Sequence, residues 1–75
     1  MKIKNVRTNT ELTQDLLAEK TNIPIRTIRS YEQGTRELDN ANISHVTKLA
    51  YNLNCKLEDI LENKENIKML KEIYK

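Results

Sequence analysis

The sequence predicts an all-α fold: a compact domain of five helices over residues 1–62, followed by an extra helix over residues 63–75. Gly and Pro occur once each among 75 residues, which leaves too few turn residues for a β-sandwich. Apolar residues recur at steps of three and four along the chain, which is typical of amphipathic helices. Because a core of this size is close to the lower limit for unaided folding, we expect one domain.

The first helix is expected over residues 2–9. Ile3 and Val6, three residues apart, point to the core. Arg7 follows Val6, and taken alone a charged residue at this place would be interpreted as exposed.

The second helix is expected over residues 13–21. The Thr13 hydroxyl can accept a hydrogen bond from a backbone N–H of the first turn. Asp15 places a negative charge where the helix dipole favours one. The inward face of this helix is expected to consist of Leu16, Leu17 and Ala18.

A tight turn separates this helix from the next. Asn22 tolerates a left-handed backbone better than any residue except Gly, so it can end the second helix sharply. Pro24 fixes its own φ and moves Ile23 toward an extended conformation, which separates the two helices.

The third helix is expected over residues 24–33, with Ile28 and Tyr31 on its buried side and Gly34 as a left-handed cap. A turn of three to four residues between two helices, the second with a basic outer face, is the geometry of a helix-turn-helix. The residues left to face outward are Ile25, Arg26, Arg29, Ser30 and Gln33.

The fourth helix is expected from about residue 41 to residue 53, with Asn40 as its N-terminal cap and Asn54 at its end. His45 lies off the apolar stripe and has no His, Cys or acidic residue at i±4, which argues against a metal site. The inward stripe is expected to consist of Ile43, Val46, Leu49, Ala50 and Leu53.

The fifth helix is expected over residues 56–61, with Leu57, Ile60 and Leu61 closing the core. Glu58 and Asp59 are adjacent carboxylates, a pattern that can indicate acid–base catalysis. Their position at the start of a helix explains them more simply, because the dipole favours negative charge there. With no Ser/His/Asp set and no phosphate-binding Gly loop, we expect no enzyme, cofactor or metal.

The tail over residues 63–75 predicts a sixth, amphipathic helix. One side carries lysines, and the other carries Ile67, Leu70, Ile73 and Tyr74. This apolar side could be a dimer face, could pack back on the domain, or could lie on a membrane surface, for which the stripe is short.

Over about four-fifths of its length the chain resembles the lambda-repressor-like (Cro/C-repressor, XRE) family of bacterial and phage regulators. The matching residues are Arg7, LTQDLLAEKT at 12–21, TIRSYEQG at 27–34 and LAYNLNCKLEDILE at 49–62. The resemblance implies the five-helix fold, DNA binding, and a largely buried ion pair between Arg7 and Glu32. The chain departs from the family where Glu11 and Asn22 replace glycines and where Pro24 replaces a capping Ser or Thr.

A helix-turn-helix that binds DNA needs base readers and phosphate anchors. Arg26 and Arg29 could each bind a guanine bidentately, Ile25 could touch a thymine methyl, and Ser30 is a less selective donor. Without the family pattern, a solvated helix face would be the better explanation of these arginines. The expected phosphate contacts are Gln14, Thr27, Thr35 and Arg36.

Charge and cysteine content fit this assignment. Residues 1–36 carry a net charge of +3 and residues 37–75 a net charge of −1, so the basic excess lies in the half with the helix-turn-helix. Cys55 is the single cysteine and is expected to be a small buried hydrophobe. The sequence shows no secretory signal pattern and no long apolar run, so we expect a cytoplasmic protein without a membrane partner.

A single recognition helix contacts only a few base pairs, and family members solve this by dimerising on a two-fold symmetric operator. We therefore expect a homodimeric repressor of the phage or mobile-element type that binds double-stranded DNA, with no small-molecule ligand evident. The alternative is a protein-interaction module of the same fold, such as an antitoxin or anti-repressor component. The outward arginines argue against that alternative, because a surface that has lost DNA binding does not need them.

Overall fold

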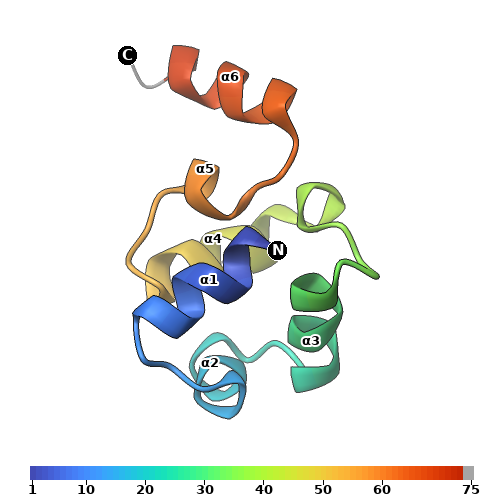
Figure 1. Cartoon of the computed structure of the whole chain (residues 1–75), viewed down its shortest axis with the longest axis vertical. Coiled ribbons are helices and arrows are strands. Elements are labelled where there is room, and N and C mark those ends of the chain that lie inside the picture. Colours follow the sequence, from blue (N-terminus) through green and yellow to red (C-terminus); the bar gives the residue numbers. More distant parts are fainter. Residues whose placement is uncertain (74–75) are drawn as a thin grey trace.

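The chain folds into six α-helices and one 3₁₀ turn in a computed structural model that describes residues 1–73. The helices are α1 (Lys2–Asn9), α2 (Gln14–Thr21), α3 (Ile25–Gln33), α4 (Ile43–Asn52), α5 (Leu57–Ile60) and α6 (Lys64–Ile73). The 3₁₀ turn η1 (Leu38–Asn40) lies between α3 and α4. Along the long axis α6 lies at one end and α2 at the other (Figure 1). The predicted all-α fold, with five helices and an extra C-terminal helix, is confirmed.

The core brings α1 to α5 together around side chains that are almost fully buried. Contacts join α2 to α3 and α4, and α1 to α3 and α5, so that α1 and α4 form the middle of the domain (Figure 1). The buried apolar residues are Ile3, Leu17, Ile23, Ile28, Tyr31, Leu38, Val46, Leu49, Ala50, Leu53, Ile60 and Leu61.

The local signals that delimit α2 and α3 act as expected. The Thr13 hydroxyl accepts a hydrogen bond from the Leu16 N–H at 3.1 Å. Asn22 has φ 58° and Gly34 has φ 81°, so each ends its helix in the left-handed region. Pro24 is the cap of α3 and has an extended ψ of 138°. Of these residues, Asn22 and Pro24 lie between the two helices and form the turn that joins them.

Two residues that were expected to face the core are exposed. Leu16 is 44% exposed, because α2 buries Leu17 and Thr21, four residues apart, and Leu16 lies beside that stripe. Ile43 is 73% exposed. Ile43 lies on the same side of α4 as Val46 by helical spacing. It is the first residue of the helix, however, and lies beyond Val46, where the core ends.

The start of α4 also differs from the expectation. The fourth helix begins at Ile43, and Asn42 is its cap, with the side-chain oxygen accepting a hydrogen bond from the His45 N–H at 2.9 Å. Asn40 belongs to the 3₁₀ turn η1 and donates from its amide to Glu37 at 2.7 Å. The 3₁₀ turn buries Leu38 in the core. Because residues 38–40 form this turn, α4 begins two residues later than expected, at Ile43.

The helix α6 is fastened to the domain at its first residues. The Asp39 carboxylate accepts hydrogen bonds from the backbone N–H groups of Glu62 at 2.8 Å and Asn63 at 3.1 Å, and from the Asn66 amide at 3.3 Å. Ile67 and Leu70 pack against the core, half-buried. Two more residues were expected on the dimer face. Ile73 is 71% exposed, and Tyr74 lies outside the described residues.

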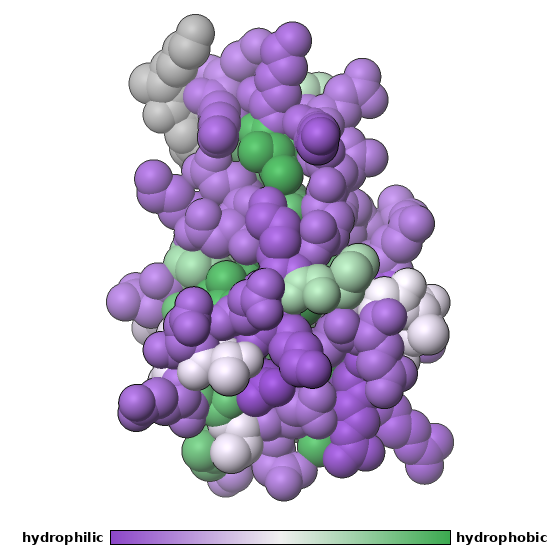
Figure 2. All heavy atoms as spheres, in the orientation of Figure 1, coloured by the Kyte–Doolittle hydropathy of each residue, from purple (hydrophilic) through white to green (hydrophobic). Residues whose placement is uncertain are grey.

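An apolar groove lies between the start of α4 and α6. Figure 2 shows that the visible face of the molecule is mostly hydrophilic, with apolar patches that include one near α6. The groove has a volume of about 360 Å³, and its walls include Ile43, Leu57, Met69, Leu70 and Ile73.

Cys55 is half-buried beside the core, and burial, together with the charge of Asp59, raises the pKa of its thiol.

Candidate nucleic-acid interface

The outer face of α3 carries the side chains that the sequence assigns to DNA reading. Ile28, Tyr31 and Glu32 hold the inner face of the helix, with exposures of 0%, 4% and 6%. Arg26 and Arg29 are exposed on the other side. Ile25, Thr27 and Ser30 are half-buried between the two faces. Arg26, Arg29 and Gln33 therefore face outward as expected, whereas Ile25 and Ser30, also expected to face outward, are half-buried.

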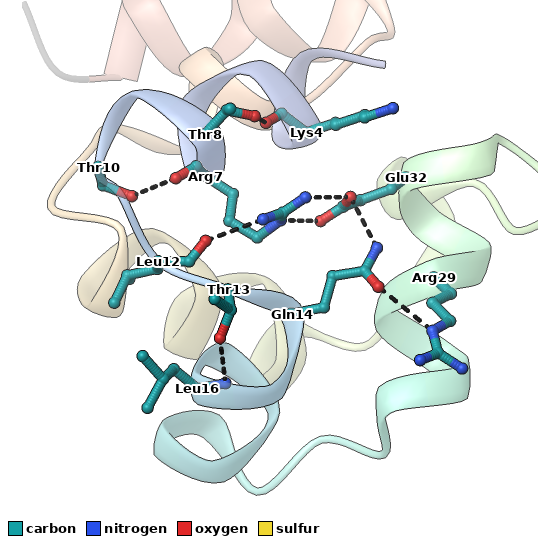
Figure 3. A network of polar contacts seen from close by, with 10 residues as sticks. All are labelled: Lys4, Arg7, Thr8, Thr10, Leu12, Thr13, Gln14, Leu16, Arg29 and Glu32. Atoms are coloured by element: carbon teal, nitrogen blue, oxygen red, sulfur yellow. Dashed lines mark hydrogen bonds and ion pairs between the residues drawn. The ribbon is translucent and has the colours of Figure 1, made fainter.

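Beneath this face, Arg7 and Glu32 form the ion pair that the family resemblance implies. Arg7 Nε lies 2.6 Å from Glu32 Oε2, and Arg7 Nη2 lies 3.0 Å from Glu32 Oε1. The side chains of Arg7 and Glu32 are 14% and 3% exposed. Arg7 Nη1 also donates to the Leu12 carbonyl at 2.8 Å. This bidentate pair ties α1 to α3 and fixes the loop before α2 (Figure 3).

The same carboxylate holds Gln14, and Gln14 in turn holds Arg29. Gln14 Nε2 donates to Glu32 Oε1 at 3.0 Å, and Arg29 Nε donates to Gln14 Oε1 at 3.2 Å. Figure 3 shows the four side chains pointing toward one another from α1, α2 and α3. Sequence reasoning placed Gln14 on a phosphate and Arg29 on a base, and it missed the contact between them.

The electrostatics of Glu32 reflect this arrangement. Burial alone would raise the pKa of its carboxyl. The hydrogen bonds from Arg7 and Gln14 and the charges of Arg7 and Lys4 more than offset burial, so the pKa of Glu32 lies below its ordinary value. The hydrogen bond from Arg7 to Glu32 raises the pKa of Arg7, although burial of the guanidinium acts in the opposite direction. Glu32 is therefore ionised at neutral pH and can only accept hydrogen bonds.

The segment after α3 is fastened to the end of that helix. The Ser30 carbonyl accepts hydrogen bonds from the Arg36 N–H at 3.2 Å and from the Thr35 hydroxyl at 3.3 Å. The Ser30 hydroxyl donates to the Arg26 carbonyl at 2.9 Å. Thr35 and Arg36 are exposed beside the C-terminus of α3. These two expected phosphate contacts therefore lie just after the helix that carries the expected base contacts.

A second polar contact joins α3 to α4. The Tyr31 hydroxyl lies 3.0 Å from His45 Nδ1, and the two rings meet edge to face with centroids 6.4 Å apart. Burial raises the pKa of Tyr31, and the charge of Arg36 opposes that shift. Sequence reasoning left His45 without a role, because its partner lies 14 residues away on another helix.

An open depression lies between the start of α2 and the start of α3. Its volume is about 590 Å³, and its charged lining residues are Lys4, Arg7, Glu11, Asp15 and Arg29. The lining therefore carries three cations and two carboxylates, so its charge is mixed. Among residues 1–73, no three His, Cys, Asp or Glu side chains gather closely enough to hold a metal ion.

The geometry defines a helix-turn-helix protein with an exposed cationic second helix. The model of the Cro/C1-type helix-turn-helix family, also called the XRE family, matches residues 3–60, and the chain belongs to this family. Its members are DNA-binding regulators and typically not enzymes. No curated protein and no solved structure matched the chain. Over the described part of the chain, every helix is too short or too polar to cross a membrane.

Proposed function

We propose that this protein is a sequence-specific transcriptional regulator, a repressor of the phage or mobile-element type, which inserts α3 into the major groove of a two-fold symmetric operator. The observation that carries the proposal is the exposed pair Arg26 and Arg29 on a helix whose inner face is fixed by a buried ion pair. A rigid helix with exposed guanidinium groups suits bidentate contacts with guanine.

The proposed base contacts are those on the outer face of α3. Arg26 and Arg29 bind guanine edges, Ile25 contacts a thymine methyl, and Ser30 donates to a base if its hydroxyl turns away from the Arg26 carbonyl. The proposed phosphate contacts lie on α2, on α3 and just after α3. They are Gln14, through the Nε2–H that Glu32 does not accept, and Thr27, Thr35 and Arg36.

Selection from a randomised duplex library tests the proposal. The wild-type protein should enrich one sequence motif, and this motif should contain an inverted repeat. On the enriched duplex, Arg26→Ala and Arg29→Ala should each lose about 1–3 kcal/mol of binding free energy, and less on a scrambled duplex. Arg36→Ala should weaken both complexes and lower the salt slope by about one. Failure to bind any duplex at low salt would refute the proposal and favour a protein-interaction module.

Two copies are needed to read two half-sites, and the end of α6 is the proposed dimer face. Ile67 and Leu70 anchor α6 on the domain, which leaves Met69 at 51% and Ile73 at 71% exposure beside the apolar groove. Exposed apolar side chains gathered in one place are typical of an association surface.

Sedimentation of two variants tests this face. Ile73→Lys should make the protein monomeric, because a charge then lies in the interface. Tyr51→Lys is the matched control, since Tyr51 is an apolar side chain on α4 with 84% exposure and the substitution changes the charge equally. If both variants sediment with the same mass as the wild type, α6 is not the dimer face. The same holds if one wild-type chain alone binds the selected duplex with its inverted repeat.

A further inference from the structure

The hydrogen bonds beneath α3 connect a residue outside that helix to one of its base readers. Gln14 belongs to α2, yet its amide contacts both Glu32 and Arg29 of α3 (Figure 3). Arg29 is exposed, and a long exposed side chain normally samples many rotamers. The contact with Gln14 restricts that freedom before DNA arrives.

The orientation of the Gln14 amide follows from the chemistry of Glu32. The two ends of a glutamine amide look alike in most structures, so their assignment depends on the hydrogen-bond partners. An ionised carboxylate can only accept, and therefore Gln14 must turn Nε2 toward Glu32. Its Oε1 then faces the opposite way, toward Arg29 Nε at 3.2 Å. Arg7 completes the arrangement, because it holds the Glu32 carboxylate at 2.6 Å from the other side.

We propose that Gln14 is a positioning residue for Arg29: it occupies the Nε–H of Arg29 and leaves the Nη1 and Nη2 hydrogens to read a guanine. The inference rests on the proposed function. Held in this way, Arg29 presents the end of its guanidinium, whose two parallel N–H groups match O6 and N7 of guanine. A side chain ordered in advance loses less entropy on binding, and the gain appears only on a duplex that has the guanine.

Arg26 gives the internal comparison. It lies one turn before Arg29 on the same face and is exposed, but its guanidinium has no hydrogen-bond partner among residues 1–73. If both arginines read guanines, the loss of Gln14 should affect the guanine read by Arg29 and spare the guanine read by Arg26. A phosphate anchor would affect neither guanine selectively, because phosphates are the same on every sequence.

The experiment compares selected motifs and affinities for single and double variants. The full-length proteins are wild type, Gln14→Met, Arg29→Met, Arg26→Met, and the two double variants that combine Gln14→Met with each arginine change. Methionine keeps the length of glutamine and removes the amide. Each protein selects from a randomised duplex library, and its affinity is measured on the wild-type motif and on a scrambled duplex at one salt concentration. Circular dichroism checks that each variant is folded.

The base pair whose preference disappears in Arg29→Met defines the Arg29 contact. Gln14→Met should lower the preference at that pair by about tenfold and keep the preference at the Arg26 pair. In Gln14→Met with Arg29→Met, the ratio of the affinity for the wild-type motif to the affinity for the scrambled duplex should be no lower than in Arg29→Met alone, since both changes remove the same base contact. A phosphate contact of Gln14 lowers both affinities alike and leaves this ratio unchanged. Gln14→Met with Arg26→Met should show the product of the two single effects, since these residues do not touch.

Two results would overturn the inference. One is an unchanged motif for Gln14→Met with equal losses on the enriched and scrambled duplexes, which would make Gln14 a phosphate anchor only. The other is a multiplicative loss, in Gln14→Met with Arg29→Met, of the ratio between the affinities for the wild-type motif and the scrambled duplex. Either differs from a failure of the proposed function, in which the wild-type protein itself would bind the library without enriching any motif.

Discussion

Replacing the Glu32 carboxylate by an amide should lower the free energy of unfolding by a large amount for so small a change. Glu32→Gln keeps the shape of the side chain and removes its charge. Arg7, whose side chain is 14% exposed, then keeps a neutral amide oxygen and the Leu12 carbonyl at 2.8 Å as acceptors. Removing one partner of a buried ion pair costs about 3–5 kcal/mol. The retained contact with Leu12 and the partial exposure of Arg7 place the expected loss near the lower end, at about 3 kcal/mol.

A loss of this size is large for the chain. Domains have a stability of about 0.05–0.15 kcal/mol per residue, which gives about 4–11 kcal/mol for 75 residues. In domains of this length, each kcal/mol shifts Tm by about 4–8 °C. Glu32→Gln should therefore lower Tm by about 12 °C or more in thermal unfolding followed by circular dichroism. The matched control is Glu19→Gln, the same change at an exposed position of α2, which should stay within about 0.5 kcal/mol of wild type.

The pH dependence of the loss gives a second check. The folded pKa of Glu32 lies below that of the unfolded chain, so the folded state binds fewer protons. The stabilisation is then fully present above the unfolded pKa of about 4.3 and is lost as the pH falls through the folded pKa. The difference in unfolding free energy between wild type and Glu32→Gln should be constant near neutral pH and shrink in acid. A pH-independent difference, or a Tm shift no larger than that of Glu19→Gln, would refute the reasoning.

Three other substitutions test separate contacts. Thr13→Ala removes the side-chain acceptor for Leu16 N–H and should cost about 1 kcal/mol in urea unfolding, with the salt slope of DNA binding unchanged. Tyr31→Phe removes the hydrogen bond with His45 and should cost about 1 kcal/mol, while a larger loss would indicate repacking of α4. Asp39→Ala removes the acceptor for the start of α6, so amide hydrogen exchange should accelerate in α6 and stay slow in α4; equal rates in wild type and variant would contradict this.

Much of the fold could be predicted because its boundaries depend on local chemistry. Thr13, Asn22 and Gly34 end or begin helices through their own side chains and backbone preferences, and a sequence contains that information. The inward or outward direction of a residue also follows from helical spacing. Ile43 shows one limit: spacing gives the face of a helix, but not how far along the helix the neighbouring elements reach. Leu16 shows another: adjacent apolar residues do not reveal which of them lies on the buried stripe.

The cap of α4 shows a second limit. Asn40 and Asn42 are equally suitable as caps, and the choice between them depends on Leu38. This residue is buried by the 3₁₀ turn that precedes the helix. Propensity alone cannot decide between two competing caps when the burial of a third residue outweighs both.

The candidate site could be predicted in its members but not in its connections. Gln14 and Arg29 are 15 residues apart, and their contact exists because the turn at Asn22 brings the start of α2 to the middle of α3. Sequence reasoning therefore gave each residue a separate partner in DNA. The family resemblance supplied the pair of Arg7 with Glu32, which spacing alone could not give, but it gave Gln14 no partner within the chain.

The Glu32 carboxylate thus has two roles, in stability and in the orientation of the DNA-facing side chains, and experiments can separate them. Glu32 holds Arg7 for stability and orients Gln14, which holds Arg29. A substitution at Glu32 changes both the fold and the DNA face, so it cannot show which contact sets specificity. Gln14 lies on one branch alone: its loss removes a hydrogen bond to Glu32 while the bidentate pair with Arg7 remains. Specificity should therefore respond to Gln14 at nearly unchanged stability, whereas stability should respond first to Arg7 and Glu32.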